Sequence, residues 1–258
     1  MKKNYRVLVL SDVHDEPDHT DWRTLNPVLD YASTQRWDEV IFLGDFLNMD
    51  CISFFNKGKP RLTEGMTLDD TFKHGQKTLD KIEKATRAKN KKVKFTFLLG
   101  NHCDRAERLI DEMPTFRGIA EVQQGLRLKE RGYKVIDNWR KGEVHIIGKL
   151  LFTHGLRSAP DNHAKMMVDR YSGYCVMYGH WHCVQEYSKI KFGDDNALFG
   201  VCVGTLGTYR PEYMGQRPSA WQQAFAEVTF RPDGFFNHFV TRIFDHAFVA
   251  PNGQFYKG

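Results

Sequence analysis

The sequence predicts an α/β protein in which packed β-sheets are covered by helices, and three observations support this class. Short apolar runs that are rich in strand-forming residues recur at residues 7–10, 40–43, 95–99, 150–152 and 175–178. Helix-like segments separate the early runs, and the last third of the chain is strand-rich. Continuous apolar runs are typical of strands buried on both faces, and their alternation with helices indicates α/β layers.

Several segments have the apolar spacing of helices. We expect helices at residues 22–35, 67–88, 104–113 and 118–131. The second of these begins with Thr67, which suits the cap position because its hydroxyl can accept a hydrogen bond from a free backbone N–H of the first turn.

The C-terminal part, residues 185–250, is expected to contribute mainly strands. The runs AFAEVTF and FFNHFVTRI flank residues 231–234, whose sequence Arg-Pro-Asp-Gly is typical of a hairpin turn. We expect this part to form a second sheet packed on the first, with helices outside the resulting sandwich.

A single domain is expected to span residues 1–258, since this length is enough for one substantial core. Residues 51–66 are longer than an ordinary link between a strand and a helix, so we interpret them as an insertion near the mouth of the site. Phe54 and Phe55 within it are expected in the core, and a substrate-facing lid is the alternative.

Composition places the chain among globular proteins. Hydrophobic residues make up 41% and charged residues 27% of the chain, which excludes a disordered protein. The N-terminal apolar run is short and leads into charge, and no later run approaches the roughly 18 residues of a membrane span. We therefore expect a cytoplasmic protein without membrane insertion.

Charge and cysteine usage narrow the expected partners and redox state. The net charge of +5 fits either an ordinary soluble surface or a surface that attracts an anionic substrate such as nucleic acid. The cysteines are scattered and include no Cys-x-x-Cys pair. They are therefore expected to be reduced thiols, and neither a disulfide framework nor a structural zinc knuckle.

Metal-ligating side chains follow each of the apolar runs, at the point where the run ends. They are Asp12 and His14, then Asp45, then Asn101 and His102, then His154, and finally His180 and His182. Because the loops that leave the carboxyl ends of strands converge, these side chains are expected to meet. Carboxylate, amide and imidazole groups without a thiolate suit two borderline divalent ions and argue against a soft structural zinc centre.

Each of these groups has an ordinary structural explanation when taken alone. A lone Asp-x-His, a Gly-Asp after a strand or a single histidine such as His154 is common in protein cores and on surfaces. The occurrence of all the groups in order, each at the same end of an apparent strand, is what favours a shared metal site.

The runs SDVH, GDFLN, GNHC, THG and GHWH together resemble the sequence blocks of the calcineurin-like metallophosphoesterase superfamily. The blocks cover residues 12–182, about two-thirds of the chain. The resemblance implies a four-layer α/β/β/α sandwich of two mixed sheets flanked by helices, in agreement with the layers predicted from the strand and helix patterns.

The resemblance also implies a role for each residue. Asp12, His14 and His182 would hold a first metal, and Asn101, His154 and His180 a second, with Asp45 bridging both. His102 would stay free of metal, face the scissile phosphate and help to protonate the leaving oxygen. Two divalent ions, with Mn first and Fe, Zn or Ni as alternatives, would lower the pKa of a bridging water so that hydroxide attacks phosphorus.

Departures from the family pattern occur in the second and third blocks. Asn48 stands where a second aspartate is usual, so it is expected to hydrogen-bond from the outer shell without supplying charge. Cys103 precedes Asp104 and is expected to be buried and inert. Asp104 either orients His102 or has no part in the site.

Arginines near these blocks bear on the substrate. Arg105 and Arg108 are either clamps for a substrate phosphate, because arginine matches phosphate geometry, or partners of Glu107 or Asp111 in surface ion pairs. The arginine that follows the second block in the protein phosphatases of the family is absent from the segment Asn-Met-Asp at 48–50. This absence disfavours the protein phosphatase branch.

We therefore expect a two-metal phosphodiesterase that acts on a nucleotide or a nucleic acid. A lipid-linked pyrophosphate hydrolase or a phosphomonoesterase is the alternative activity. A non-catalytic metal-binding interaction scaffold is the alternative of another class. Retention of His102 and of every ligand position argues against the scaffold.

Overall fold

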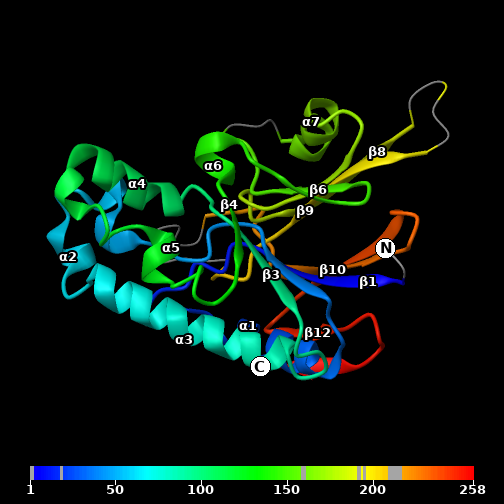
Figure 1. Cartoon of the computed structure of the whole chain (residues 1–258), viewed down its shortest axis with the longest axis horizontal. Coiled ribbons are helices and arrows are strands. Elements are labelled where there is room, and N and C mark those ends of the chain that lie inside the picture. The colour runs from blue at the N-terminus through cyan, green and yellow to red at the C-terminus, as the bar shows by residue number, and fades with distance from the viewer. Residues whose placement is uncertain (1–2, 18–19, 158–160, 191–192, 194–195, 209–216) are drawn as a thin grey trace.

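Two β-sheets pack face to face, and helices cover their outer faces (Figure 1). This computed structural model describes residues 3–17, 20–157, 161–190, 193, 196–208 and 217–258. Helices α1 (Trp22–Thr34) and α3 (Leu68–Thr86) lie on one outer face, and α6 (Asn138–Lys141) and α7 (His163–Arg170) lie on the opposite side. The predicted four-layer α/β/β/α sandwich is therefore confirmed.

The first sheet has the strand order β11-β10-β1-β2-β3-β4. Its members are β1 (Tyr5–Leu10), β2 (Glu39–Phe42), β3 (Lys94–Leu98), β4 (Lys134–Ile136), β10 (Ala224–Phe230) and β11 (Phe236–Arg242). Strands β1 to β4 run parallel, whereas β10 and β11 form an antiparallel hairpin against β1. The sheet is therefore mixed.

The second sheet has the order β5-β6-β7-β9-β8. Its members are β5 (His145–Ile147), β6 (Leu150–Thr153), β7 (Cys175–Tyr178), β8 (Val184–Lys189) and β9 (Leu198–Val203). Strands β6, β7 and β9 are parallel, with β5 and β8 antiparallel at the edges. A small hairpin of β12 (Ala247–Val249) and β13 (Phe255–Lys257) lies against α1.

The expected division of strands between the sheets was right for β8 and β9, which lie in the second sheet, and wrong for β10 and β11. The C-terminal part was expected to form the second sheet, but β10 pairs with β1, with Val228 opposite Val7, while β6 and β7 lie in the other sheet. Strand β10 is buried along almost its whole length, which suits an interior position beside β1. An apolar run in the sequence indicates that a strand is buried, but it does not indicate which strand pairs with it.

The helices begin largely where the sequence indicated. Thr67 Oγ1 accepts a hydrogen bond from the backbone N–H of Asp70 at 3.0 Å and caps α3. Helix α4 (Cys103–Glu112) is also confirmed. The expected helix at 118–131 was wrong, because only α5 (Val122–Gly125) is helical and Arg127 has a left-handed backbone with φ 56°.

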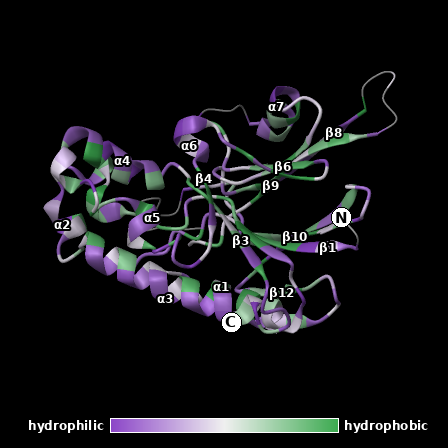
Figure 2. Cartoon of the chain, in the orientation of Figure 1, coloured by the Kyte–Doolittle hydropathy of each residue, from purple (hydrophilic) through white to green (hydrophobic). Residues whose placement is uncertain are grey.

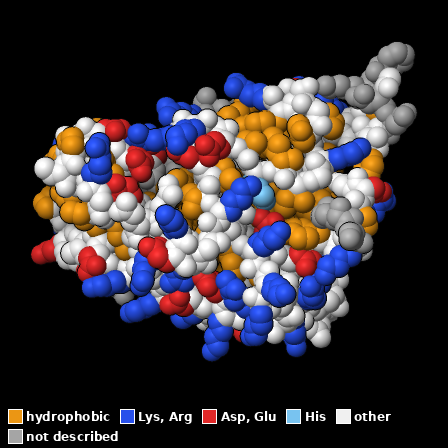
Figure 3. All heavy atoms as spheres, in the orientation of Figure 1, with side chains coloured by type: hydrophobic (Ala, Val, Ile, Leu, Met, Phe, Trp, Pro, Cys, Tyr) orange, Lys and Arg blue, Asp and Glu red, His pale blue; other side chains and the backbone are white. Residues whose placement is uncertain are grey.

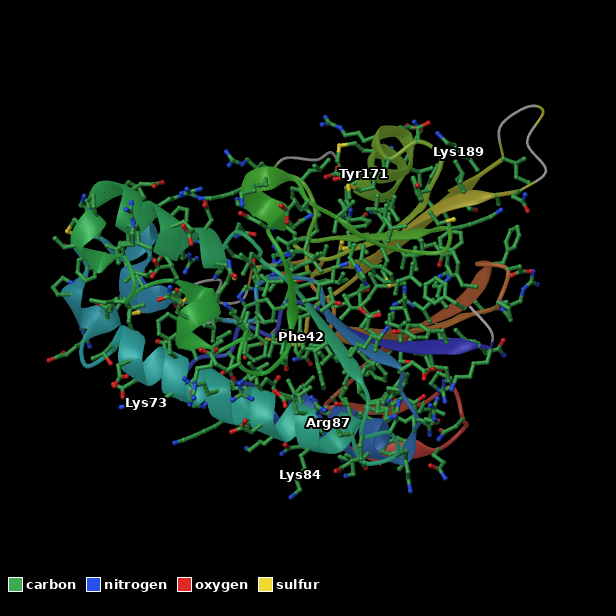
Figure 4. The ribbon with its side chains drawn as sticks, viewed as in Figure 1. Phe42, Lys73, Lys84, Arg87, Tyr171 and Lys189 are labelled. Atoms are coloured by element: carbon green, nitrogen blue, oxygen red, sulfur yellow. The ribbon has the colours of Figure 1, made fainter. Side chains whose placement is uncertain are left out.

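Alternate side chains of β1 pack into two different hydrophobic cores. Leu8 and Leu10 belong to the core under α1 and α3, whereas Val7 and Val9 pack in the core between the two sheets. Phe42 lies inside the first core, and Lys73 and Lys84 point outwards from α3, whereas Arg87 at its C-terminal end lies over the Phe95 ring at 4.8 Å (Figure 4). Figure 2 shows the same division, with hydrophilic residues along the outer side of α3.

The segment at 51–66 is built from short helical turns on the surface. These are η1 (Asp50–Ile52), η2 (Phe54–Asn56) and α2 (Pro60–Thr63). Phe54 and Phe55 are 71% and 75% exposed, so their expected place in the core was wrong. Glycine, proline and lysine surround them in the sequence and keep the segment on the outside. Among the described residues, no helix is long and apolar enough to cross a membrane.

Candidate metal centre

The carboxyl ends of five strands bring the predicted site residues together. Asp12 and His14 follow β1, Asp45 follows β2, and Asn101 and His102 follow β3, all in the first sheet. From the second sheet, His154 follows β6, and His180 and His182 follow β7. Both sheets therefore contribute side chains to one cluster.

One part of the cluster joins Asp12, His14 and His182. Nε2 of His14 lies 3.0 Å from Nε2 of His182, and Asp12 Oδ1 lies 3.2 Å from the latter atom. One ligand atom from each of the three side chains lies within 4.8 Å of the others, a grouping that could hold a metal ion.

A second part joins Asp45, Asn101, His154 and His180. Nε2 of His154 lies 3.2 Å from Asp45 Oδ2 and 2.8 Å from Asn101 Oδ1. Asp45 groups within 4.8 Å both with His154 and His180 and with His14 and His102. Its carboxylate therefore lies between the two parts of the cluster, at the position that a bridging ligand would need.

Buried polar atoms without partners test whether a cation suits this place. Asp12 Oδ2 accepts hydrogen bonds from the His180 backbone N–H, at 3.0 Å, and from the Ser11 hydroxyl. Among the described residues, Asp12 Oδ1 and His182 Nδ1 are buried and make no hydrogen bond, although Asp12 Oδ1 lies 3.2 Å from His182 Nε2. A carboxylate oxygen without a hydrogen bond in a protein interior is costly, so a cation at Asp12 would satisfy it.

The protonation states of two imidazoles also suit a cation, whereas the Asp45 carboxylate, acting against burial, raises the pKa of His154 to about 9. Burial, together with the neighbouring His182, lowers the pKa of His14 to about 4. Burial, together with the neighbouring His154, likewise lowers the pKa of His180 to about 4. Both rings are therefore neutral near pH 7, which is the form that binds metals.

The loops that carry these residues have unusual backbones. A positive φ occurs at five residues of the cluster, namely Asp12, His14, Asp45, His180 and His182. Such conformations are unfavourable for residues other than glycine and gather at functional sites. Gly179 adds a steric limit, since a Cβ there would lie 2.2 Å from Ser11 Oγ and 2.4 Å from Asp12 Oδ2.

Backbone oxygens and an amide hold the imidazole rings. His154 Nδ1 lies 2.7 Å from the Leu43 carbonyl oxygen, which directs Nε2 toward Asp45. His14 Nδ1 lies 3.3 Å from Asn48 Oδ1. The amide of Asn48 can therefore orient a ring without carrying charge, as its outer-shell role required.

His102 is held by Asn48 and Asp45. Its backbone N–H donates to Asp45 Oδ1 at 2.8 Å, and its Nδ1 lies 2.7 Å from the Asn48 carbonyl oxygen. Arg105 Nη2 donates to His102 Nε2 at 3.2 Å. Burial lowers the pKa of His102 well below its usual value.

Asp104 does not orient His102. Its two carboxylate oxygens accept hydrogen bonds from Arg108 Nε at 2.8 Å and Arg140 Nε at 2.6 Å. The helical geometry of α4 turns Asp104 away from the cluster and toward α6. Cys103 is buried as expected, and burial raises the pKa of its thiol.

Arg105 has a partner that the sequence did not suggest. Its Nη1 donates to Asp50 Oδ1 at 2.9 Å and to the Asn48 carbonyl oxygen at 2.8 Å. The expected alternatives, Glu107 and Asp111, do not fill this role; Asp111 pairs with Arg140. Asp50 begins η1, so the surface segment and the cluster are linked through Arg105.

Two tryptophans at the cluster were missed by sequence reasoning. The Trp221 ring lies 4.2 Å from the His182 ring, and the Trp139 ring lies 5.0 Å from the His180 ring, centroid to centroid. These side chains form apolar walls beside the histidines. Neither belongs to a motif, so no local pattern in the sequence marked them.

The family model for calcineurin-like phosphoesterases matches residues 5–199. No curated protein matches the chain.

Three solved structures are similar in fold. Vps29 from Entamoeba histolytica, complexed with Zn²⁺, is 15% identical, with 93% of each chain covered and a TM-score of 0.48. Vps29 from Chaetomium thermophilum is 10% identical, with 93% of this chain and 97% of that chain covered and a TM-score of 0.42. The nuclease MPE from Pseudomonas putida is 15% identical, with 89% and 85% covered and a TM-score of 0.38.

Proposed function

The chain belongs to the calcineurin-like phosphoesterase family, and from this premise we propose that it is a two-metal phosphodiesterase. Phosphoester hydrolysis with divalent metals is the chemistry of this family. The observation that carries the proposal is the position of Asp45, whose carboxylate lies within reach of both histidine groups. Single metal sites do not need such a shared carboxylate.

We assign the ligands by these two groups. Asp12, His14 and His182 would hold the first cation, Asn101, His154 and His180 the second, and Asp45 both. The unpartnered Asp12 Oδ1 and the neutral His14 and His180 support the assignment. Oxygen and nitrogen donors suit borderline ions, so manganese is the first choice and iron, zinc or nickel the alternatives.

The cations would supply an activated water near neutral pH and neutralise phosphoryl charge in the transition state. The chain's own groups provide positioning and the proton. His102 Nδ1–H donates to the Asn48 carbonyl oxygen, which fixes the ring with Nε2 toward Arg105. In this arrangement Nε2 accepts a hydrogen bond from Arg105 and carries no proton. A bound anionic phosphate would raise the pKa of His102, so that Nε2 takes up a proton and passes it to the leaving oxygen. The fork of Arg105 would donate hydrogen bonds to a phosphoryl oxygen.

The proposed substrate is a nucleotide or nucleic-acid diester. An open hollow of about 630 Å³ lies between α4 and α6, with Arg108, Arg140, Lys141 and Arg157 among its lining residues. The hollow could receive the chain beyond the scissile phosphate. Asp104, Glu107 and Asp137 also line the hollow, and Arg108 and Arg140 pair with Asp104, so its excess of positive charge is small. This small excess supports an anionic ligand. On the face in Figure 3, basic side chains are spread widely and not gathered over one element.

Turnover of two model substrates tests the activity. Purified protein with added Mn²⁺ should hydrolyse bis(p-nitrophenyl) phosphate faster than p-nitrophenyl phosphate. His102→Ala should remove at least about 10²-fold of this rate, the usual contribution of a general acid. His238→Ala, on β11 and outside the cluster, is the matched control.

Other outcomes separate the alternatives. Preference for the monoester would favour a phosphomonoesterase, and cleavage of a lipid-linked pyrophosphate alone would favour that hydrolase. Bound metal without turnover in Mn²⁺, Ni²⁺, Zn²⁺ or Fe²⁺ would favour the interaction scaffold. A gel shift with DNA that weakens as salt rises would support nucleic acid over a small nucleotide.

A further inference from the structure

A second group of ligand-type side chains lies behind the metal centre. His163 begins α7, Cys183 precedes β8, and Cys202 lies in β9. Nε2 of His163 is 3.1 Å from Cys183 Sγ. One ligand atom of each of the three residues lies within 4.8 Å of the others. The fold thus unites an imidazole and two thiols from three distant segments.

We propose that His163, Cys183 and Cys202 bind a thiophilic cation of the Zn²⁺ type. Thiolate sulfur and imidazole nitrogen are preferred zinc ligands, and three of them leave a tetrahedral position for water. Because the group contains no carboxylate, hard ions such as Mn²⁺ or Mg²⁺ are disfavoured. Binding would release the thiol protons to solvent as the sulfur–metal bonds form.

The second nitrogen of His163 supports this assignment. Its Nδ1 lies 2.5 Å from the Tyr178 hydroxyl. A polar partner on one ring nitrogen fixes the ring, and this arrangement recurs where the other nitrogen binds a metal. Nε2 is thereby directed at Cys183.

The surroundings are apolar on one side and open on the other. Cys202 and His163 are buried, and the Trp181 ring stacks on His163 with centroids 5.5 Å apart. Cys183 is half-buried, so a cation can arrive on its side. An apolar wall strengthens the attraction between thiolate and cation. Figure 1 shows α7 lying over the sheet at this place.

The proposed site and the metal centre share one turn. Cys183 directly follows His182, and Cys202 Sγ donates to the Gly179 carbonyl oxygen at 3.7 Å. A cation held by sulfur would therefore brace the turn that carries His180 and His182. The two places select different ions, because one offers sulfur and the other offers oxygen and nitrogen.

Titration of the full chain with Co²⁺ under reducing conditions tests the proposal. Sulfur bound to Co²⁺ gives an intense near-ultraviolet charge-transfer band that oxygen and nitrogen ligands do not give. We expect this band to saturate at about one equivalent of sulfur-bound metal per chain. Cys202→Ser and Cys183→Ser should abolish it, and Cys175→Ser, a buried thiol of β7, should keep it.

A second measurement uses the unmodified chain, so its result does not depend on whether a variant folds. Saturating Zn²⁺ should slow alkylation of Cys183 by at least about tenfold, since a metal-bound thiolate is a poor nucleophile. Cys51 is also half-buried and serves as the internal reference. Phosphodiesterase activity does not enter either readout, so failure of the proposed function and failure of this site are distinguishable.

Three results would overturn the proposal. The first is absence of the sulfur band at saturating Co²⁺. The second is equal alkylation of Cys183 with and without Zn²⁺. The third is a Cys183–Cys202 disulfide that persists under reductant, because it would remove both thiols from metal binding.

Discussion

The floor of the metal centre and its rim differ in how firmly they are held. We define the floor as Asp12, Asp45 and His154, which are buried, and the rim as Asp50 and Arg105 with the exposed η2 segment. Backbone groups of neighbouring loops bond to each floor residue. The rim is held through side chains: Arg105 pairs with Asp50, and the Asn48 amide donates to Asp50 Oδ2 at 2.7 Å.

This difference separates chemistry from selectivity. The floor has several independent restraints on each side chain, so any change there should disturb metal binding itself. The rim includes the exposed rings of Phe54 and Phe55, so changes there should alter which substrate is accepted. Variants of floor and rim residues should therefore differ in their effects on metal binding and on substrate selection.

Asp45→Asn should produce the largest loss. The amide keeps the shape but removes the charge that two cations would share, so turnover should fall about 10³-fold. Assays with bis(p-nitrophenyl) phosphate and measurement of bound metal would check this. If Asp50→Asn on the rim cost as much, the distinction between floor and rim would be wrong.

Gly179→Ala should disturb the floor through steric overlap, without changing any charge or hydrogen-bonding group. The added Cβ would lie 2.2 Å from Ser11 Oγ, so the turn must shift, at a cost of about 1–3 kcal/mol. Thermal unfolding and a metal titration should both register the change. At Gly118 an added Cβ meets nothing within 4 Å, so Gly118→Ala should leave metal affinity unchanged.

Arg105→Ala should affect binding of substrate more than binding of metal. We expect a loss of about 10- to 100-fold in kcat/KM, since hydrogen bonds to charged groups contribute about 1.5–3 kcal/mol. Arg105→Lys should recover only part, because lysine lacks the planar fork. Arg36→Ala, whose residue pairs with Asp38 away from the centre, is the control. Loss of metal from Arg105→Ala would contradict a rim role.

Phe54→Ser and Phe55→Ser should have the smallest effect on stability, within about 0.5 kcal/mol, because both rings are exposed. A raised KM for a long nucleic-acid substrate, with an unchanged KM for bis(p-nitrophenyl) phosphate, would support the lid interpretation. Phe46→Ala is the contrast, since that ring is fully buried and its loss should cost about 3–5 kcal/mol.

The sequence predicted the floor better than the rim for a physical reason. A buried strand that ends in a polar residue is a local pattern, so Asp12, Asp45 and His154 could be placed without knowing the fold. The structure brings these side chains together, while their roles as ligands stay a prediction. The single domain over residues 1–258 also stays a prediction, which rests on the length of the chain alone.

What escaped prediction depends on partners that are distant in sequence. The Asn48 carbonyl oxygen holds His102, but every residue has such an oxygen, so no motif marks it. Trp221 reaches His182 because the backbone N–H of the next residue, Gln222, donates to the His182 carbonyl oxygen at 2.7 Å. The meeting of His163 with Cys183 likewise depends on how α7 packs on the second sheet. Tertiary packing, and not local preference, decides all three.

Because the proposed ligands come from both sheets, bound cations would link the first sheet to the second. A cation at about 100 times its dissociation constant would add about 2.7 kcal/mol to the free energy of unfolding. Chelation should therefore lower the melting temperature as well as stop turnover. Limited proteolysis of the chelated protein should begin near residues 179–183, where the second sheet would lose its hold on the first.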